Sequence, residues 1–189
     1  MTDYVNEISA YFEREKRVID SIDKNSISEV MNVLEKARTE GRTIFIMGNG
    51  GSAATASHFV CDFNKGVSMN QDQRYRFVCL NDNVPTMMAY ANDISYNDIF
   101  IGQLKNLYRK GDVVIGISGS GNSENVVRAV LWAKDNEAVT IAITGFDGGK
   151  IHHIADYGVN IPINDMQITE DLHMVLDHCM MKILSPEYN

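Results

Sequence analysis

The stretch that decides the fold is Val113-Val114-Ile115-Gly116-Ile117-Ser118-Gly119-Ser120-Gly121-Asn122-Ser123. Its apolar first half predicts a strand that is covered on both faces, and the residues from Glu124 onward predict a helix. The loop between them therefore lies at a helix N-terminus, where free backbone N–H groups and the helix dipole favour an anion. Its three serines add hydroxyl donors. This loop indicates either a phosphate site or an ordinary polar turn of Gly and Ser.

Four further β-rich runs predict strands, and helices or glycine-bearing loops separate them. These runs lie at 42–47, 75–80, 139–143 and 157–163. Strands that alternate with helices form a parallel sheet with helices on both faces, and such sheets bind ligands at the carboxyl ends of the strands. We therefore expect an α/β fold, a three-layer sandwich around five parallel strands.

A second glycine loop, at 48–52, follows the first of these runs. It does not match the dinucleotide pattern Gly-x-Gly-x-x-Gly, because Ala53 or Thr55 stands at the last position, depending on the glycine from which the pattern is counted. This argues against a nicotinamide cofactor. If the sheet is parallel, the loop gathers with the serine loop at one edge.

The first 41 residues have a different pattern from the rest of the chain. Apolar residues recur at helical spacing over 4–22 and again from about 26 to 40, and Gly41 is placed as a stop. We expect a helical hairpin that packs on the main domain or on another copy of the chain. The chain is thus predicted to be a single domain over 1–189, with the hairpin at 1–41 and the α/β core at 42–189.

Composition excludes several classes of partner. The chain has 189 residues, 44% of them hydrophobic and 22% charged, and a formal net charge of -8. An acidic chain argues against nucleic acid and against an anionic membrane surface, and we see no signal peptide and no apolar run near the ~20 residues that span a bilayer. We expect a cytoplasmic protein whose three cysteines are reduced.

Two groups of polar residues could carry chemistry. His58 and Asp62 are four residues apart on one helix face, which suits a metal site, an acid/base pair or an ordinary surface pair. Near the C-terminus, on a helix we expect Thr169 or a neighbour to cap, His173 and His178 lie about 140° apart, so one of them is expected to be structural. Glu170 and His178 lie ~12 Å apart along the axis, so they share a site only if the helix begins after Glu170 or two subunits contribute.

Several ordered motifs together resemble one family. They are Gly48-Asn49-Gly50-Gly51-Ser52-Ala53-Ala54 with His58-Phe59, Ala91-Asn92-Asp93, Ile117 to Ser123, and Thr144-Gly145-Phe146-Asp147-Gly148-Gly149-Lys150. The chain resembles the sugar isomerase (SIS) family over nearly its whole length, and within it the phosphoheptose isomerases, which convert sedoheptulose 7-phosphate to a heptose 7-phosphate. The resemblance implies a flavodoxin-like sheet, a phosphorylated sugar as substrate, a zinc ion and a homotetramer with active sites between subunits.

The resemblance also implies roles for individual residues. Asp62 and His178 would be the acid/base pair of an isomerisation through an enediol. The metal ligands would be His58, Asp62, Glu170 and His178. The substrate-binding residues would be Asn49, Gly50, Gly51, Ser52, Asn92, Asp93, Ser118, Gly119, Ser120, Ser123 and Glu170, with the four serines on the phosphate.

The chain departs from the family pattern at several of these positions. Asp62 stands where a glutamate is usual, Glu170 replaces a glutamine and Gly119 replaces a threonine. Gln167 stands where an aspartate is common, and Lys65 lies one position before an expected arginine. These departures bear on which sugar phosphate is the substrate, so an isomerase of a different sugar phosphate is one alternative. A sugar-phosphate sensor and a non-catalytic SIS protein that binds a partner are two others, and the presence of both His58 and His178 argues against the partner-binding protein.

Overall fold

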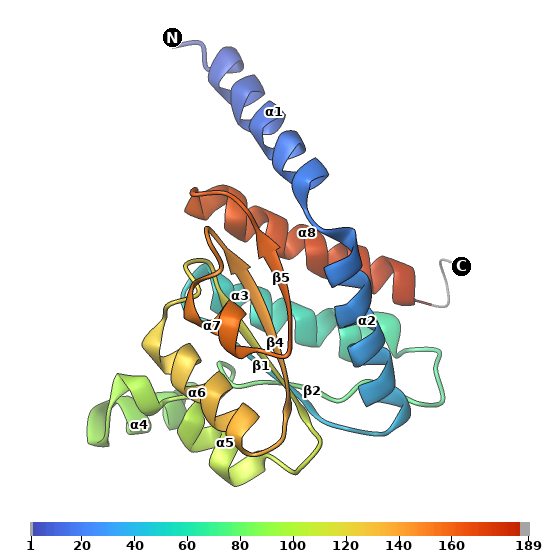
Figure 1. Ribbon diagram of the computed structural model, residues 1–189, viewed down its shortest axis with the longest axis vertical. Helices are drawn as coiled ribbons and strands as arrows, with labels where there is room; N and C mark the ends of the chain where they lie inside the picture. Colours follow the sequence, from blue (N-terminus) through green and yellow to red (C-terminus); the bar gives the residue numbers. More distant parts are fainter. Residues whose placement is uncertain (1, 186–189) are drawn as a thin grey trace.

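A five-stranded parallel sheet forms the centre of the computed structural model, which describes residues 2–185 (Figure 1). The strands are β1 (Ile44–Met47), β2 (Phe77–Cys79), β3 (Val113–Ser118), β4 (Val139–Gly145) and β5 (Tyr157–Ile161). Each adjacent pair is parallel, in the order β2-β1-β3-β4-β5. The predicted α/β class and the five parallel strands are confirmed.

This strand order places the two glycine loops side by side. From β1 the chain crosses to β2 on one side, whereas β3, β4 and β5 follow on the other side. The order in which the chain adds strands therefore reverses between β1 and β3, which makes this position the switch point of the sheet. At a switch point the connections that leave the two strands run to opposite faces of the sheet and open a crevice. The loops after β1 and β3 are the Gly48 loop and the serine loop.

Helices cover both faces of the sheet, as the alternation of side chains along β1 requires. Ile44 and Ile46 join a core with α2 (Lys24–Thr39), α3 (Gly51–Cys61) and α8 (Met166–Leu184). Phe45 and Met47 point to the other face. The helical segments on that side are α4 (Val84–Asp93), η2 (Tyr96–Asp98), α5 (Ile101–Leu107), α6 (Glu124–Asp135) and α7 (Gly149–Ile154).

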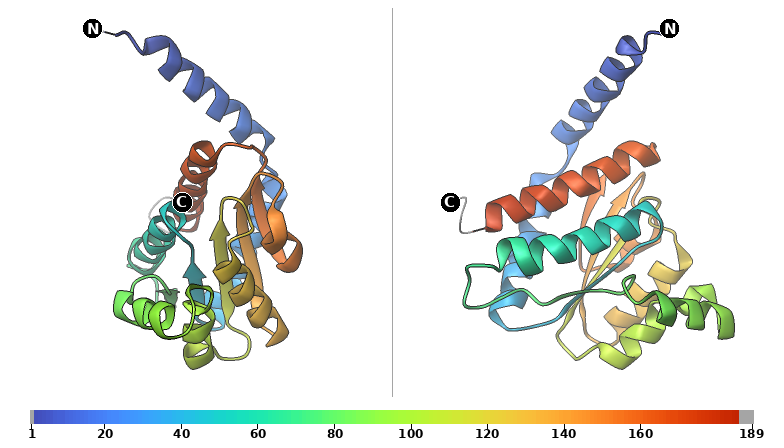
Figure 2. Two further views of the ribbon diagram at one scale, coloured as in Figure 1. Left: turned by 90° about the vertical axis from the view of Figure 1, so that its left-hand side faces the viewer. Right: turned by 180° about the vertical axis from the view of Figure 1, so that it is seen from behind.

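The N-terminal helices do not form the hairpin predicted from their apolar patterns. α1 (Val5–Ser21) extends away from the sheet and α2 continues in the same general direction along it (Figures 1 and 2). The apolar side chains of α1 that a hairpin would cover are exposed, among them Ile8 and Phe12. α1 instead contacts the start of α8, where Tyr11 donates a hydrogen bond to Asp171 and Arg14 pairs with Asp165 at 2.7 Å.

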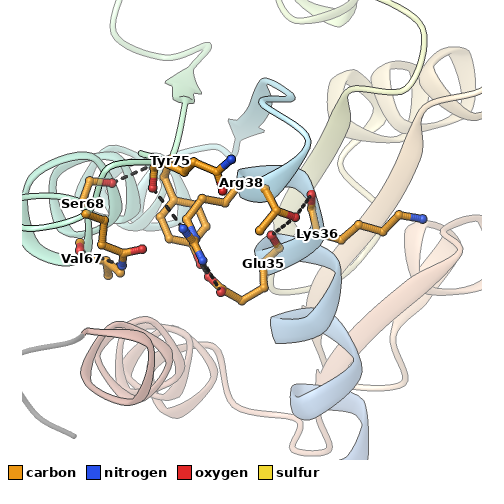
Figure 3. Close-up of polar contacts among 9 residues, drawn as sticks. Glu35, Lys36, Arg38, Val67, Ser68 and Tyr75 are labelled. Carbon is orange, nitrogen blue, oxygen red and sulfur yellow. Dashed lines mark hydrogen bonds and ion pairs between the residues drawn. The ribbon is translucent and has the colours of Figure 1, made fainter.

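The turn of π-helix that follows α3 is held in place by α2 and by the chain before β2. This element, η1 (Asp62–Val67), ends at Ser68, whose Oγ donates to the carbonyl of Phe63 at 2.7 Å and accepts the backbone N–H of Tyr75 at 2.9 Å. The Tyr75 hydroxyl donates to Glu35 of α2, and Figure 3 shows Arg38 on the same carboxylate. This network fixes η1, and with it the position of Asp62.

Two smaller findings complete the fold. α8 begins at Met166 and is capped by Asp165, whose Oδ1 accepts the N–H groups of Gln167 and Ile168, so Thr169 lies inside the helix. No helix in the described part of the chain is long and apolar enough to cross a membrane.

Candidate active site

A small pocket lies where the two loops of the switch point meet α8. Its volume is about 100 Å³. It is lined by Asn49, Ser52, Ile117, Ser118, Gly119, Ser120, Ser123, Met166 and Glu170. The loop that follows β3 ends at Ser123, the residue that precedes α6, and Ser118 Oγ lies 3.2 Å from Ser123 Oγ. Hydroxyls and a helix N-terminus thus converge on a space that suits an anion.

Close packing sets the backbone path of the serine loop. Gly121 has a φ of +65°, and a Cβ on it would collide with the carbonyl oxygen of Gly148 in the loop after β4. The carbonyl of Gly121 in turn accepts the N–H of Ile151 at 3.0 Å. At Gly119 a Cβ would meet the sulfur of Met166, so a larger residue there requires this side chain to move.

A second group of polar side chains gathers on α3 and α8, which lie side by side (Figure 2). His58 comes from α3, Asp62 is the first residue of η1, and Asp177 and His178 come from α8. The Nε2 atoms of His58 and His178 are 3.0 Å apart, and they lie 3.5 and 3.9 Å from Asp62 Oδ2. One ligand atom from each of the four residues falls within 4.8 Å of all the others. We call these four residues the His–Asp cluster.

Asp177 is the member of the cluster that the sequence analysis missed. Its side chain is fully buried, and neither carboxylate oxygen has a hydrogen-bond partner among residues 2–185. Burial raises the pKa of Asp177 to about 8, and the neighbouring Asp62 carboxylate adds to the increase. A signal was present, because Asp177 occupies an inward position of the helical pattern between the buried residues His173 and Met180.

The cluster has the ligand chemistry of a metal site. Two imidazole nitrogens and two carboxylates match the donors that divalent transition metals accept. An unpartnered buried carboxylate is also costly by itself, so the orphaned oxygens of Asp177 fit a site that a cation completes.

Comparison with known proteins identifies the family. The SIS domain profile matches residues 3–145. The phosphoheptose isomerase of Thermodesulfovibrio yellowstonii is 35% identical over 95% of this chain and 90% of its own length. That of Aliarcobacter butzleri is 32% identical over 97% and 96% of the two chains.

The chain belongs to the SIS domain family, in its phosphoheptose isomerase branch. The solved phosphoheptose isomerase of Neisseria gonorrhoeae superimposes with a TM-score of 0.88 at 29% identity, covering 96% of this chain and 98% of that one. The enzyme of Francisella tularensis gives 0.89 at 25% identity, with 97% and 99% covered. The resemblance drawn from the motifs is thereby confirmed, and the protein is a phosphosugar isomerase.

Two histidines of α8 have different surroundings in this SIS domain. His173 is fully buried, and its Nε2 lies 3.0 Å from the carbonyl oxygen of Thr144 at the end of β4. Burial lowers the pKa of His173 to about 4, so its imidazole is neutral at physiological pH. His178 is exposed and belongs to the His–Asp cluster.

Glu170 lies at the serine pocket and not in the His–Asp cluster of its own chain. Its carboxylate packs against Gly51 at the start of α3, so closely that a Cβ there would collide with it. Eight residues of helix, ~12 Å, separate it from His178 along α8. Within one chain, Glu170 therefore lies at the serine-pocket end of α3 and α8.

The remaining predicted substrate residues divide into two groups. Asn49 lines the serine pocket and exchanges hydrogen bonds of 2.8 and 2.9 Å with Asn125, while Gly50 caps α3. Asn92 and Asp93 lie at the end of α4, where Asn92 Nδ2 donates to Asp93 Oδ1 at 2.8 Å. Asp93 lines a separate pocket, so these two residues do not border the serine pocket of their own chain.

Proposed function

We propose that the protein interconverts sedoheptulose 7-phosphate and a heptose 7-phosphate through an enediol. The observation that carries this proposal is that α3 and α8 each contribute to both polar regions. Ser52 and Glu170 border the serine pocket, and His58 and His178 belong to the His–Asp cluster. The same two helices thus position groups for a phosphate and groups for proton transfer.

In this proposal the serine pocket anchors the phosphate of the sugar. The hydroxyls of Ser52, Ser118, Ser120 and Ser123 donate to its oxygens, and the N-terminus of α6 stabilises their charge. Asn49 and Glu170 face the same pocket and are placed to bind sugar hydroxyls.

Asp62 and His178 are the acid/base pair in this scheme. One group takes the proton from the hydroxyl-bearing carbon next to the ketone and returns it to the former carbonyl carbon. The other moves protons between the two oxygens, so that ketose and aldose interconvert without a change in atoms or electrons. Asp62 Oδ2 lies 3.9 Å from His178 Nε2, so both groups can serve one pair of adjacent carbons.

We also infer a divalent metal ion, zinc by its match to imidazole and carboxylate ligands. His58, Asp62, Glu170 and His178 are the residues proposed to hold it. When bound, such an ion supplies Lewis-acid polarisation of the substrate carbonyl. Because Glu170 is ~12 Å along α8 from His178, its contribution to this ion would come from a second copy of the chain.

We further propose that the protein is a homotetramer with active sites at the subunit interfaces. The exposed apolar face of α1 supports this, because Val5, Ile8 and Phe12 are each more than half exposed, at 62%, 51% and 53%. A face of this kind on a helix that extends from the domain favours burial against another copy. Light scattering coupled to size-exclusion chromatography should give four times the chain mass of 21.2 kDa.

The isomerisation is tested by NMR in deuterated water. Metal-loaded protein is incubated with sedoheptulose 7-phosphate, fructose 6-phosphate, ribulose 5-phosphate and unphosphorylated sedoheptulose. We expect deuterium beside the carbonyl of the heptose phosphate and little with the unphosphorylated sugar. Exchange with only another ketose phosphate would show that the proposed substrate is wrong. No exchange with any of these sugars would contradict the isomerisation and favour a protein that only binds sugar phosphates.

A further inference from the structure

We propose that Asp177 is itself a ligand of the metal ion, so that one chain supplies four ligands without Glu170 of a second copy. This inference rests on the metal ion of the proposed function and changes which residues hold it. The ligand set becomes His58, Asp62, Asp177 and His178, all of which lie close together in the single chain.

The state of the Asp177 side chain is the first argument. It is fully buried in α8, and neither carboxylate oxygen has a partner within the described chain. A buried polar group in a native protein is normally paired with protein, water or an ion. A cation between the two helices would satisfy both oxygens at once.

The neighbours of Asp177 are the second argument. The other members of the cluster are two imidazoles and the carboxylate of Asp62, and no described side chain donates a hydrogen bond to either oxygen of Asp177. Two carboxylates and two neutral imidazoles balance the charge of a divalent cation and give the four-coordinate set that zinc takes. The carboxylates of Asp62 and Asp177 lie close together, and a cation bound by both would relieve their mutual repulsion.

The placement of Glu170 is the third argument. Its carboxylate packs on Gly51 and lines the serine pocket, where the sugar phosphate is proposed to bind. If Asp177 completes the metal site, Glu170 is free to bind sugar hydroxyls in its own chain. Metal binding would then persist in a chain whose interfaces are disrupted.

Metal affinity tests the assignment independently of turnover. Metal-free protein is titrated with Zn²⁺ against a chromophoric chelator, using the wild type, Asp177→Asn and Glu170→Gln, with Asp171→Asn as the control. Asp171 lies on the same helix, is exposed and has the same side chain, so the control measures the effect of removing a carboxylate that lies outside the cluster. We expect Asp177→Asn to weaken affinity at least about 100-fold, beyond the loss typical of groups around a ligand. The Zn²⁺ affinity of Glu170→Gln and of Asp171→Asn should stay within about threefold of the wild type, because salt screens the effect of charges that lie far from the ion.

A thiolate probe provides a second readout. In Asp177→Cys loaded with Co²⁺, direct ligation gives a near-ultraviolet sulfur-to-cobalt charge-transfer band that the wild type and Asp171→Cys lack. Wild-type protein is the baseline for the exposed Cys61 and Cys179 that flank the cluster. Thermal denaturation of each metal-free variant confirms that it is folded.

The outcomes separate this inference from the proposed function. Wild-type affinity in Asp177→Asn together with no band in Asp177→Cys would overturn the ligand role of Asp177. A loss in Glu170→Gln as large as that in Asp177→Asn would overturn the claim that one chain is sufficient. If the wild type binds no Zn²⁺ while it isomerises the sugar phosphate, the proposed metal site is wrong and the proposed isomerisation is unaffected.

Discussion

The serine pocket and the His–Asp cluster share two helices but are built in different ways. Five of the nine residues that line the pocket lie between Ile117 and Ser123, at the end of β3 and in the loop before α6, and the other four come from the β1 loop, α3 and α8. The cluster consists of side chains from α3, η1 and α8, brought together only by the packing of these elements. The pocket therefore depends largely on one local stretch of sequence, whereas the cluster depends entirely on tertiary packing.

The largest expected effect is the loss of turnover when the cluster is broken. His178→Gln removes one of the two proposed proton-transfer groups, so kcat with sedoheptulose 7-phosphate should fall about 10²- to 10⁴-fold while KM changes little. Since His178 is exposed, the melting temperature of the metal-free protein should not fall. His153→Gln, at an exposed histidine of α7, is the control. Equal losses in the two variants would place the chemistry elsewhere.

The serine pocket should be most sensitive to substitutions that change the backbone path of its loop. Gly121→Ala forces a side chain onto the carbonyl of Gly148 at a φ of +65° and should destabilise the protein by roughly 2–4 kcal/mol. Gly41→Ala is the matched control, since its φ is +66° and no atom lies within 4 Å of the added Cβ, so only about 1–2 kcal/mol is expected. Urea unfolding measures both. A cost for Gly41→Ala equal to that for Gly121→Ala would show that packing against the loop after β4 does not shape the serine loop.

The two histidines of α8 belong to different environments: His178 lies in the His–Asp cluster, and His173 lies in the buried core. Burial lowers the pKa of His173 to about 4, below its usual 6.5, so the unfolded chain binds this proton more readily than the folded one. Stability should fall as the pH drops through that window, by about 2 kcal/mol between pH 7 and pH 5. His173→Gln should abolish this part of the pH dependence in urea unfolding. An unchanged slope would mean that His173 is not buried as a neutral group.

The smallest effect is expected from a single hydroxyl of the pocket. Ser123→Ala removes one donor to a charged phosphate, and at roughly 1.5 kcal/mol this should raise KM about tenfold with kcat nearly unchanged. Ser9→Ala on exposed α1 is the control. If Ser123→Ala lowered kcat instead, the hydroxyl would act in the chemistry and not in anchoring.

The features that could be predicted from the sequence are those that depend on residues close together in the chain. The strands, the loops after β1 and β3, and the serines of the pocket follow from apolar runs and turn residues close together in the chain. The spacing of His58 and Asp62 also indicated a shared face. These features depend on few long-range contacts, so local patterns were sufficient.

The features that the sequence did not reveal depend on tertiary packing. In the open arrangement of α1 and α2, Tyr11 and Arg14 contact the start of α8, and no local pattern encodes these contacts. Asp177 was overlooked because an acidic residue inside an apolar helical stripe needs a neighbouring helix to explain it. The separation of Glu170 from the cluster was foreseen from helix geometry, yet its contact with Gly51 required the fold.

The central claim is that the serine pocket binds the substrate and the His–Asp cluster moves its protons. The most direct test compares substrate affinity with deuterium uptake in two variants. Calorimetry with sedoheptulose 7-phosphate should give His178→Gln an affinity within about threefold of the wild type, although NMR detects no deuterium uptake. The double variant Ser118→Ala and Ser123→Ala should bind at least about tenfold more weakly. The account would be contradicted if His178→Gln lost binding as fully as the double serine variant, or if the double variant bound like the wild type.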